Sequence, residues 1–253
     1  MKRQIPENPW SDRDVEAHWD AVAPVYVSEN ERVSRTHDQR FREAVKYLEL
    51  EDGMKVLNIT SRDGEATDHI LGQNPSCRVV NAEISAGLME VAASIRPGIT
   101  QVKISTYSRI PFPDGHFHRI VSLETLEHVA EPLEFLRELH RVSVPGAILV
   151  LSCPPATSEI PYRIYSLLFG GHGEGPHRFP PSRRVKRMLS LTGWELVVHR
   201  GTVLIPAGPQ WLQQWGEKVI ERFQGTWISE LGIRQFYVCR KAGSKNDRRW
   251  EDR

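Results

Sequence analysis

The hydrophobic and polar positions from residue 53 to residue 155 alternate between two kinds of segment. Four short apolar runs have the length of buried strands: 54–59, 77–84, 117–123 and 147–153. A fifth run, 99–105, has a weaker apolar pattern. Three segments between them have helical character: 65–72, 86–95 and 132–142. Alternation of strands and helices predicts right-handed βαβ units and a mostly parallel sheet.

The flanking regions have other patterns. Residues 1–12 form a polar arm, a helix starts near Ser11, and residues 30–49 have helical composition. After residue 153 we expect an apolar helix, a Gly/Pro-rich loop, a helix, a strand, a helix with Trp211 and Trp215, and a last strand. In that order, these elements lie at 158–169, 170–181, 182–192, 194–204, around 211–223 and 235–241, and a polar tail follows at 242–253. Before residue 153, Pro145-Gly146 is expected to form a turn that leads into the strand 147–153.

Composition narrows the class of protein. The chain of 253 residues is 40% hydrophobic and 26% charged, which suits a globular domain with a real core. A net charge of +1 argues against nucleic acid as an obligatory partner. Cys77, Cys153 and Cys239 have no zinc spacing, so we expect reduced thiols and no metal site. No signal peptide or long apolar span is evident, which predicts a cytoplasmic protein by elimination.

Five motifs, in order, carry a family resemblance that covers residues 17–241. They are AHWDAVAPVYVSENE, DGMKVLNITSRDGEAT, VVNAEIS, IPFPDGHFHRIVSLETLEHVAEPLEFLRELHRVSVPGAILVLSCPP and HRFPPSRRVKRMLSLTGWELV. The chain resembles the class I S-adenosylmethionine-dependent methyltransferases, and is similar to the quinone C-methyltransferases among them. The resemblance implies a Rossmann-like three-layer α/β fold: strand order 3-2-1-4-5, then a hairpin with strand 7 antiparallel beside strand 6.

The resemblance also implies a domain plan and a place for the site. One domain spans 1–253, with a helical cap at 1–50, a cofactor-binding half at 53–155, an acceptor-side half at 156–241 and a flexible tail at 242–253. Ligands of open α/β sheets bind outside the carboxyl ends of the strands. The expected cofactor site therefore uses the loops after Ile59, Glu83, Ser105 and Leu123.

The first turn departs from the family pattern acid-x-Gly-x-Gly-x-Gly. The same seven positions read Asn58, Ile59, Thr60, Ser61, Arg62, Asp63 and Gly64. Asn58, Thr60, Asp63 and Gly64 are expected to contact the cofactor. Glycine permits positive φ and close approach of a ligand, which larger side chains obstruct. Arg62 has three interpretations: it faces solvent, it blocks the site, or it pairs with the cofactor's carboxylate.

The ends of the second and third strands supply the remaining expected contacts. Glu83 suits the ribose hydroxyls, as strand-end acids do in dinucleotide sites, although it could also be an exposed glutamate. Ile84 would pack on the adenine. Thr106 stands where the family has an acid, with Tyr107 beside it, and a hydroxyl is the weaker acceptor. His118 replaces an aspartate of the family.

Other candidates rest on the resemblance and have structural alternatives. Tyr26 matches a tyrosine that folds over the cofactor, or packs as a helix aromatic, and His18 and Trp19 share that ambiguity. His128 suits a general base, but a structural role is favoured. The remaining positions are Glu124 and Glu127, which shape the cofactor edge or cap a helix, and His172 and His177, which contact acceptor or solvent.

The apolar segment 160–169 and the helix with Trp211 and Trp215 could be ordinary core, line an acceptor pocket or touch a membrane; core is the favoured interpretation. The leading hypothesis is methyl transfer from S-adenosylmethionine, which becomes S-adenosylhomocysteine, to a small hydrophobic acceptor. A non-catalytic binding or scaffolding subunit is the alternative, and a third is a different reaction in the same pocket. A membrane surface or a protein is left open as a partner.

Overall fold

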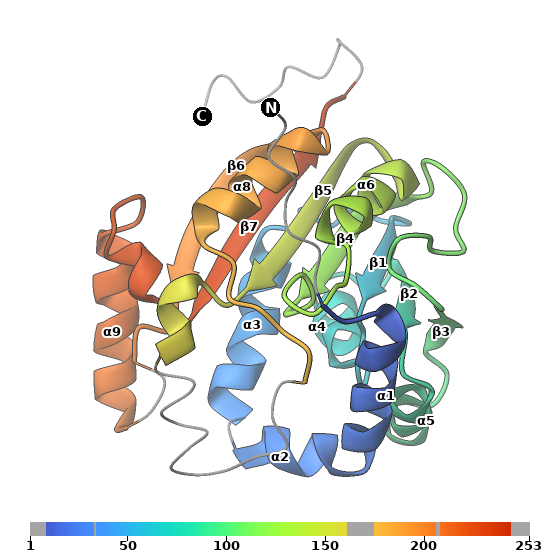
Figure 1. The fold of residues 1–253 in the computed structure, drawn as a ribbon, viewed down its shortest axis with the longest axis horizontal. Coiled ribbons are helices and arrows are strands. Elements are labelled where there is room, and N and C mark those ends of the chain that lie inside the picture. Colours follow the sequence, from blue (N-terminus) through green and yellow to red (C-terminus); the bar gives the residue numbers. More distant parts are fainter. Residues whose placement is uncertain (1–8, 33, 161–174, 206–207, 244–253) are drawn as a thin grey trace.

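The computed structural model describes residues 9–32, 34–160, 175–205 and 208–243, which build one seven-stranded sheet (Figure 1). Its order is β3-β2-β1-β4-β5-β7-β6. The strands are β1 Lys55–Ile59, β2 Arg78–Glu83, β3 Thr100–Lys103, β4 Phe117–Leu123, β5 Ser143–Cys153, β6 Trp194–Thr202 and β7 Arg234–Lys241. All pairs are parallel except those that β7 makes with β5 and β6. The predicted Rossmann-like sheet is confirmed.

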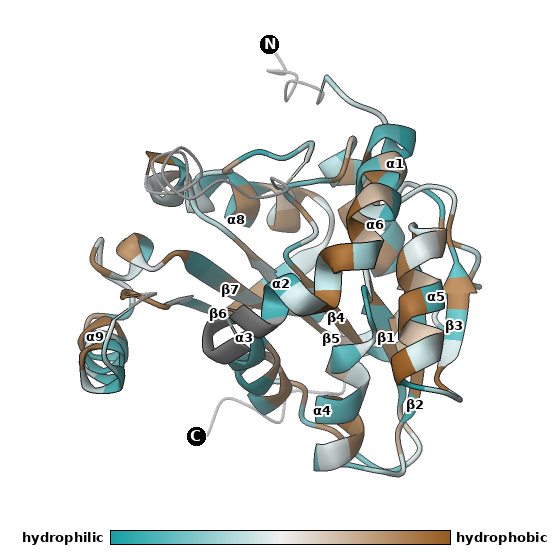
Figure 2. Cartoon of the chain, turned by 90° about the horizontal axis from the view of Figure 1, so that it is seen from below, coloured by the Kyte–Doolittle hydropathy of each residue, from teal (hydrophilic) through white to brown (hydrophobic). Residues whose placement is uncertain are grey.

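Helices cover both faces of the sheet. They are α1 Asp12–Val22, α2 Tyr26–Arg32, α3 Ser34–Lys46, α4 Glu65–Gln73, α5 Ala86–Ile95, α6 Pro132–Val142, α8 Ser182–Leu191 and α9 Gln210–Arg222, with 3-10 turns η1 Ala23–Val25, η2 Ala156–Ser158 and η3 Ser229–Leu231. Helices α6 and α8 lie against one face and α3 and α4 against the other (Figure 2). The expected three-layer arrangement follows.

The core is divided between the two faces by the strand period of two. In β5, Leu149, Leu151 and Cys153 belong to the cluster under α6 and α8, whereas Ile148 and Val150 belong to the cluster under α3 and α4. Strands buried on both faces read as continuous apolar runs, which is the pattern of residues 147–153. Burial on both faces therefore explains why this strand was visible in the sequence.

The main difference from the predicted elements lies at Pro145-Gly146. These residues were predicted to form a turn, but they lie inside β5, which begins at Ser143. The register jumps there, from Phe117 opposite Ser143 to Arg119 opposite Ile148, and Gly146 has φ 78°. A bulge absorbs the extra residues while the ladder continues, so the Pro-Gly pair produces an irregularity rather than a chain reversal.

The long helical segment predicted at 30–49 is divided between α2 and α3. The N-terminal helix α1 begins as predicted: Ser11 caps it, its side chain accepts from the Asp14 N–H, and the Asp14 carboxylate accepts from the Ser11 N–H. The segment 161–174, with His172, and most of the tail lie outside the described residues. Among the described helices, none is both long and apolar enough to cross a membrane.

The core interpretation of the C-terminal tryptophans is wrong. Trp211 is 68% exposed and Trp215 is 55% exposed. Only Gly216 and Ile220 of α9 are buried. The helix follows the edge strand β6 and contacts that strand with one side, whereas no element of the described residues covers the opposite side (Figure 1).

Candidate functional site

The turn after β1 keeps a glycine-like backbone although two of its expected glycines are replaced. Thr60 has φ 59°, Arg62 has φ 54° and Gly64 has φ 82°. The N–H groups of Thr60 and Ser61 both donate to the carbonyl of Ala82 at the end of β2. Left-handed conformations are costly for residues with a Cβ and persist only where surroundings enforce them. The turn therefore has a backbone path that glycine would adopt without strain.

The Asn58 side chain is hydrogen-bonded within the sheet in this structure. It is 3% exposed, and its Nδ2 donates to Asn81 Oδ1 at 2.8 Å across the pair β1–β2. Thr67 of α4 donates to the same oxygen at 2.9 Å. The Asn58 amide thus bonds to the neighbouring strand, because an amide can satisfy another amide in a buried location.

Glu83 has the position at the end of β2 that the sequence predicts, but it is fully buried. Its Oε2 accepts from the Arg62 N–H at 2.7 Å, and its Oε1 accepts from the N–H groups of Ile84 and Ser85. These bonds hold the two turns at the switch point together. The alternative of an exposed strand-end glutamate is therefore wrong.

Arg62 turns inward. The residue is 7% exposed, and its guanidinium carbon lies 3.4 Å from the centre of the Trp19 ring. Its charge influences the ionisation of Tyr26, Tyr107 and His128, which places the guanidinium among the expected cofactor contacts. No ion pair to Arg62 occurs among the described residues, and its buried Nη1 has no hydrogen-bond partner there. The solvent-facing interpretation is wrong.

Asp12, which the sequence analysis did not single out, contacts the end of β3. Its Oδ2 accepts from Thr106 Oγ1 at 2.5 Å and from the Tyr107 N–H at 2.9 Å. The Thr106 hydroxyl donates to Asp12 and accepts from the Ser108 N–H at 3.2 Å, so both of its roles are filled within the protein. The residues are 94 and 95 positions apart in sequence, so no local pattern reveals the contact. A pocket of about 400 Å³ opens beside Thr106, between α1 and the segment 129–131.

Aromatic side chains surround the Arg62 guanidinium. Tyr107 is fully buried, and burial raises the pKa of its hydroxyl, which lies beside Thr60. Tyr26 is 6% exposed, meets Trp19 edge to face, and burial raises its pKa too. Trp19 and Tyr26 of the N-terminal helices therefore lie near Arg62, and His18 meets the Trp19 ring edge to face; the contact of Tyr26 with a cofactor stays a prediction.

His128 is held as a neutral ring. Burial and, after it, the charge of Arg62 lower the pKa of its imidazole to about 3. Nδ1 lies 2.8 Å from the Pro176 carbonyl, so Nδ1 carries the proton and donates. The backbone carbonyl of His128 accepts from the Trp10 indole at 2.6 Å. A ring with this pKa is a weak base at neutral pH, which favours the structural role.

The other candidate residues are buried or contact groups within the protein. Asp63 pairs with Arg96 at 3.2 Å, Gly64 is the N-cap of α4, and Ile84 and Leu123 are buried core residues. Glu124 pairs with Arg234 of β7 at 3.0 Å and accepts from Ser152 of β5. The sequence did not indicate Arg234 as the partner of Glu124. Of the last three, Glu127 is buried, His118 accepts from the Lys55 N–H, and His177 Nδ1 donates to the Gly175 carbonyl.

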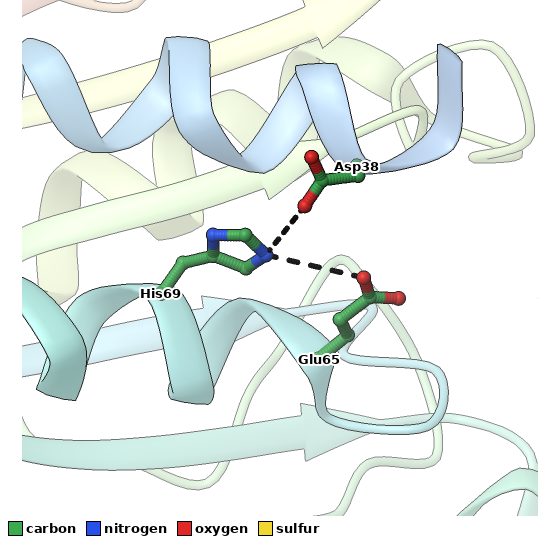
Figure 3. A group of neighbouring side chains, drawn as sticks. All are labelled: Asp38, Glu65 and His69. Carbon is green, nitrogen blue, oxygen red and sulfur yellow. Dashed lines mark ion pairs between the residues drawn. The ribbon is translucent and has the colours of Figure 1, made fainter. Parts of the chain in front are cut away.

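A second polar cluster, formed by Asp38, Glu65 and His69, joins α3 to α4 (Figure 3). His69 Nε2 lies 3.3 Å from Asp38 and 3.9 Å from Glu65, and all three side chains are half-buried. Asp38 also pairs with Arg42, and Glu65 Oε2 accepts from His37 Nε2 at 2.8 Å. Each carboxylate thus already has a cationic or N–H partner within the protein.

Comparisons with known proteins agree with this architecture. Residues 57–151 match the family described as a methyltransferase domain. The chain is 27% identical to a ubiquinone/menaquinone biosynthesis C-methyltransferase of Geobacter sulfurreducens, over 71% of this chain and 80% of that protein. It is 26% identical to the demethylmenaquinone methyltransferase of Thermus thermophilus, over 69% and 90% of the two chains. With the enzyme of Paenarthrobacter aurescens, 29% identity extends over 55% and 54%.

Solved structures share the fold at lower identity. The [4+2]-cyclase SpnF superposes with a TM-score of 0.69 at 16% identity, covering 95% of this chain and 99% of that one. A SAM-dependent methyltransferase of Thermotoga maritima superposes with a TM-score of 0.62 at 18% identity, covering 88% and 99%. One of these neighbours bears the name of a cyclase, so the fold by itself leaves the reaction undetermined.

Proposed function

Because this chain belongs to the class I S-adenosylmethionine-dependent methyltransferase family, we propose that it transfers a methyl group from S-adenosylmethionine to a small hydrophobic acceptor. The cofactor supplies a methyl group on a positively charged sulfur. The observation that carries the proposal is the first turn, which keeps positive φ at three alternate positions and is tied to a strand-end acid, Glu83.

The turn and its surroundings fit a polar ligand. Buried polar atoms without a hydrogen-bond partner among the described residues gather there: Thr60 Oγ1, Ser61 Oγ, Arg62 Nη1 and Trp19 Nε1. Such atoms are rare in folded proteins because each costs free energy unless something satisfies it. Glu83 Oε2 accepts one bond from the protein and has capacity for another, which suits a ribose hydroxyl.

Arg62 is the residue that decides how the cofactor is held. A buried guanidinium without a carboxylate partner is destabilising, so its retention needs a reason. We propose that Arg62 pairs with the carboxylate of the cofactor's methionyl group. In this structure the Arg62 guanidinium lies over the Trp19 ring. To pair with the carboxylate, the guanidinium has to move away from that ring. Arginine suits the task because its planar fork binds carboxylates bidentately.

The hydrophobic acceptor is proposed from the names of the quinone methyltransferases to which the chain is similar. The neutral His128 and the buried Tyr26 and Tyr107 give the region beside Arg62 little charge of its own. Methyl transfer depends chiefly on placing the acceptor in line with the methyl group. We therefore assign His128 to positioning: its ring donates to Pro176 and so holds the loop before α8 over the site.

The test of this proposal is calorimetric titration with S-adenosylhomocysteine and with methylthioadenosine, which lacks the amino-acid group. We expect the wild type to bind both. Arg62→Gln should weaken S-adenosylhomocysteine roughly tenfold or more, the usual cost of a lost charge-assisted pair, and leave methylthioadenosine unchanged. Arg109→Gln, an exposed arginine outside the site, is the matched control.

Each other outcome has a defined meaning. If Arg62→Gly tightens the binding of both ligands, Arg62 obstructs the site and does not pair with the carboxylate. If neither ligand binds to the wild type or to any Arg62 variant, the transferase proposal is wrong and a non-catalytic role replaces it. Methylated product from a quinone-type acceptor, detected by mass spectrometry, separates methyl transfer from other chemistry in the same pocket.

A further inference from the structure

The exposed face of α9 combines tryptophans with cationic residues. Trp211, Trp215, Lys218 and Arg222 follow one another at intervals of four, three and four residues, which places them on one side of a helix. All four are exposed, whereas the buried Gly216 and Ile220 lie on the opposite side. Gly216 packs against Ile205, which anchors that side to the protein.

The two acidic residues of α9 each have a partner in the protein, although Glu221 is itself exposed. Glu217 accepts from the Val203 N–H at 2.7 Å, and Glu221 lies 3.6 Å from Arg200 of β6. Each carboxylate of the helix therefore has a partner in β6 or just after it, and the two cations of the helix lie on the same side as the tryptophans. A surface of this kind is complementary to a negatively charged, partly apolar partner.

Further aromatic surface continues past the helix. Trp227 is 73% exposed and Phe223 is 40% exposed. The three most exposed tryptophans of the described chain therefore all lie between residues 211 and 227. Scattered exposed apolar residues are ordinary, but a concentration of large aromatics marks an interaction surface. Figure 2 shows α9 at the border of the protein beyond β6, with hydrophobic and hydrophilic residues along it.

We propose that this face of α9, comprising Trp211, Trp215, Lys218 and Arg222, docks on an anionic lipid membrane. Tryptophan is favoured at the boundary between headgroups and acyl chains, because its ring is apolar and its N–H is polar. Helices that lie in this boundary combine such aromatics with Lys and Arg. Each cation near an anionic leaflet adds about 1 kcal/mol of attraction, close to fivefold in affinity.

The place of α9 in the fold gives the docking a consequence. The helix follows β6, whose direction is that of the parallel strands because both β5 and β6 pair antiparallel with β7. The carboxyl end of β6 at Thr202 thus lies at the same edge of the sheet as the turns after β1, β2 and β4. If the proposed function holds, an acceptor dissolved in the bilayer would be near this edge.

The experiment is sedimentation of the full chain with vesicles, without cofactor or acceptor. Vesicles of phosphatidylcholine mixed with phosphatidylglycerol are compared with vesicles of phosphatidylcholine alone. We expect binding to the anionic vesicles, weaker binding at high salt, and a blue shift of tryptophan emission. The double variant Lys218→Gln/Arg222→Gln should bind about tenfold or more weakly, since two cations are lost.

Two further variants decide the matter. Trp211→Gln/Trp215→Gln should abolish the blue shift and most of the binding, while Ile95→Gln/Leu191→Gln, which removes exposed apolar residues elsewhere, should bind as the wild type does. Binding of the tryptophan double variant at wild-type strength, or no binding of the wild type, overturns the proposal. A wild-type dimer in sedimentation velocity that the tryptophan variant dissolves would assign the face to a second copy.

These assays separate the docking from the proposed function. S-adenosylhomocysteine titration of the two α9 variants should match the wild type, because α9 contributes none of the residues around Arg62. Vesicle binding without cofactor binding would leave the docking intact and remove the transferase. Cofactor binding without vesicle binding would remove the membrane docking and leave the transferase proposal intact.

Discussion

At the scale of single residues, Thr60 and Arg62 show what the altered turn costs. Each adopts positive φ with a Cβ, at about 1 kcal/mol or more of backbone strain per residue. The bonds of Glu83 to the Arg62 N–H, and of Ala82 to the Thr60 and Ser61 N–H groups, hold the path in place. Of the five non-glycine residues with positive φ in the described chain, two lie in this turn, and strained backbone often serves function.

His128 allows a test of the electrostatics around Arg62. Because burial, and then the Arg62 charge, lower the pKa of His128 to about 3, its ring should remain neutral from pH 5 to pH 8. We expect its NMR ring resonances, assigned with His128→Gln, to be constant across that interval. In Arg62→Gln the pKa of His128 should rise, since one unfavourable charge is gone. A midpoint between pH 5 and pH 8 in the wild type would contradict this account.

At the scale of elements, α3 and α4 are joined by charge and by aromatic contact. Phe41 of α3 stacks on His69 of α4 with a centroid distance of 5.3 Å. Glu65, in the first turn of α4, accepts from His37 of α3, and a carboxylate there also suits the helix dipole. Because α4 begins at the end of the altered turn, the contact between His37 and Glu65 helps to hold that end of the turn in place.

Glu65 should make stability depend on pH. Burial raises the pKa of its carboxyl, but the bonds to His37 and His69 together outweigh burial and hold the pKa well below its usual range. A depressed folded-state pKa stabilises the fold above the unfolded pKa of about 4.3, and this stabilisation is lost as pH falls further.

Glu65→Gln should therefore lower the free energy of unfolding at pH 7 by about 1 kcal/mol, allowing for partial exposure. Urea unfolding at a series of pH values should show the difference from the wild type shrinking below about pH 4. Glu134→Gln, which removes an exposed pair with Arg137, is the matched control and should have little effect. A difference that stays constant down to pH 3 would refute the assignment.

At the scale of the whole molecule, the N-terminal helix α1 is part of the same core as the sheet. Val15, Trp19 and Val22 pack in one cluster with Leu57 and Leu149. Polar contacts reinforce the packing: Asp12 accepts from Thr106 and Tyr107, and Asp20 accepts from Ser85 and Gly87 at the start of α5. We therefore expect α1 to unfold together with the sheet rather than before it.

Asp12→Ala tests this cooperation. The change leaves the buried N–H of Tyr107 without its acceptor, which costs about 1–3 kcal/mol. For a chain of this size each kcal/mol lowers Tm by roughly 2–4 °C. Calorimetry should show one transition at lower temperature, and hydrogen exchange should show faster exchange in α1. Arg13→Ala, an exposed neighbour on the same turn, should leave Tm unchanged. A second, earlier transition would show that α1 unfolds separately.

The sequence by itself determined the alternation of strands and helices and the positions of the site's turns, while the strand order came from the family resemblance. Strands buried on both faces are continuous apolar runs, and helices between them repeat at 3.6 residues, so both are visible locally. Glu83 could be placed because a strand-end position follows from the strand that precedes it. The replaced glycines at 60 and 62 were equally plain, since residue identity needs no structure.

Only the tertiary structure decided what these residues touch. Arg62 lies over Trp19, and Asp12 takes the N–H of Tyr107, across separations that no periodicity spans. The exposure of Trp211 and Trp215 was also beyond the sequence, because an apolar helix position is buried or bare according to whether another element covers it. Strand β6 is the edge of the sheet, and no element of the described residues covers the outer side of the helix that follows it.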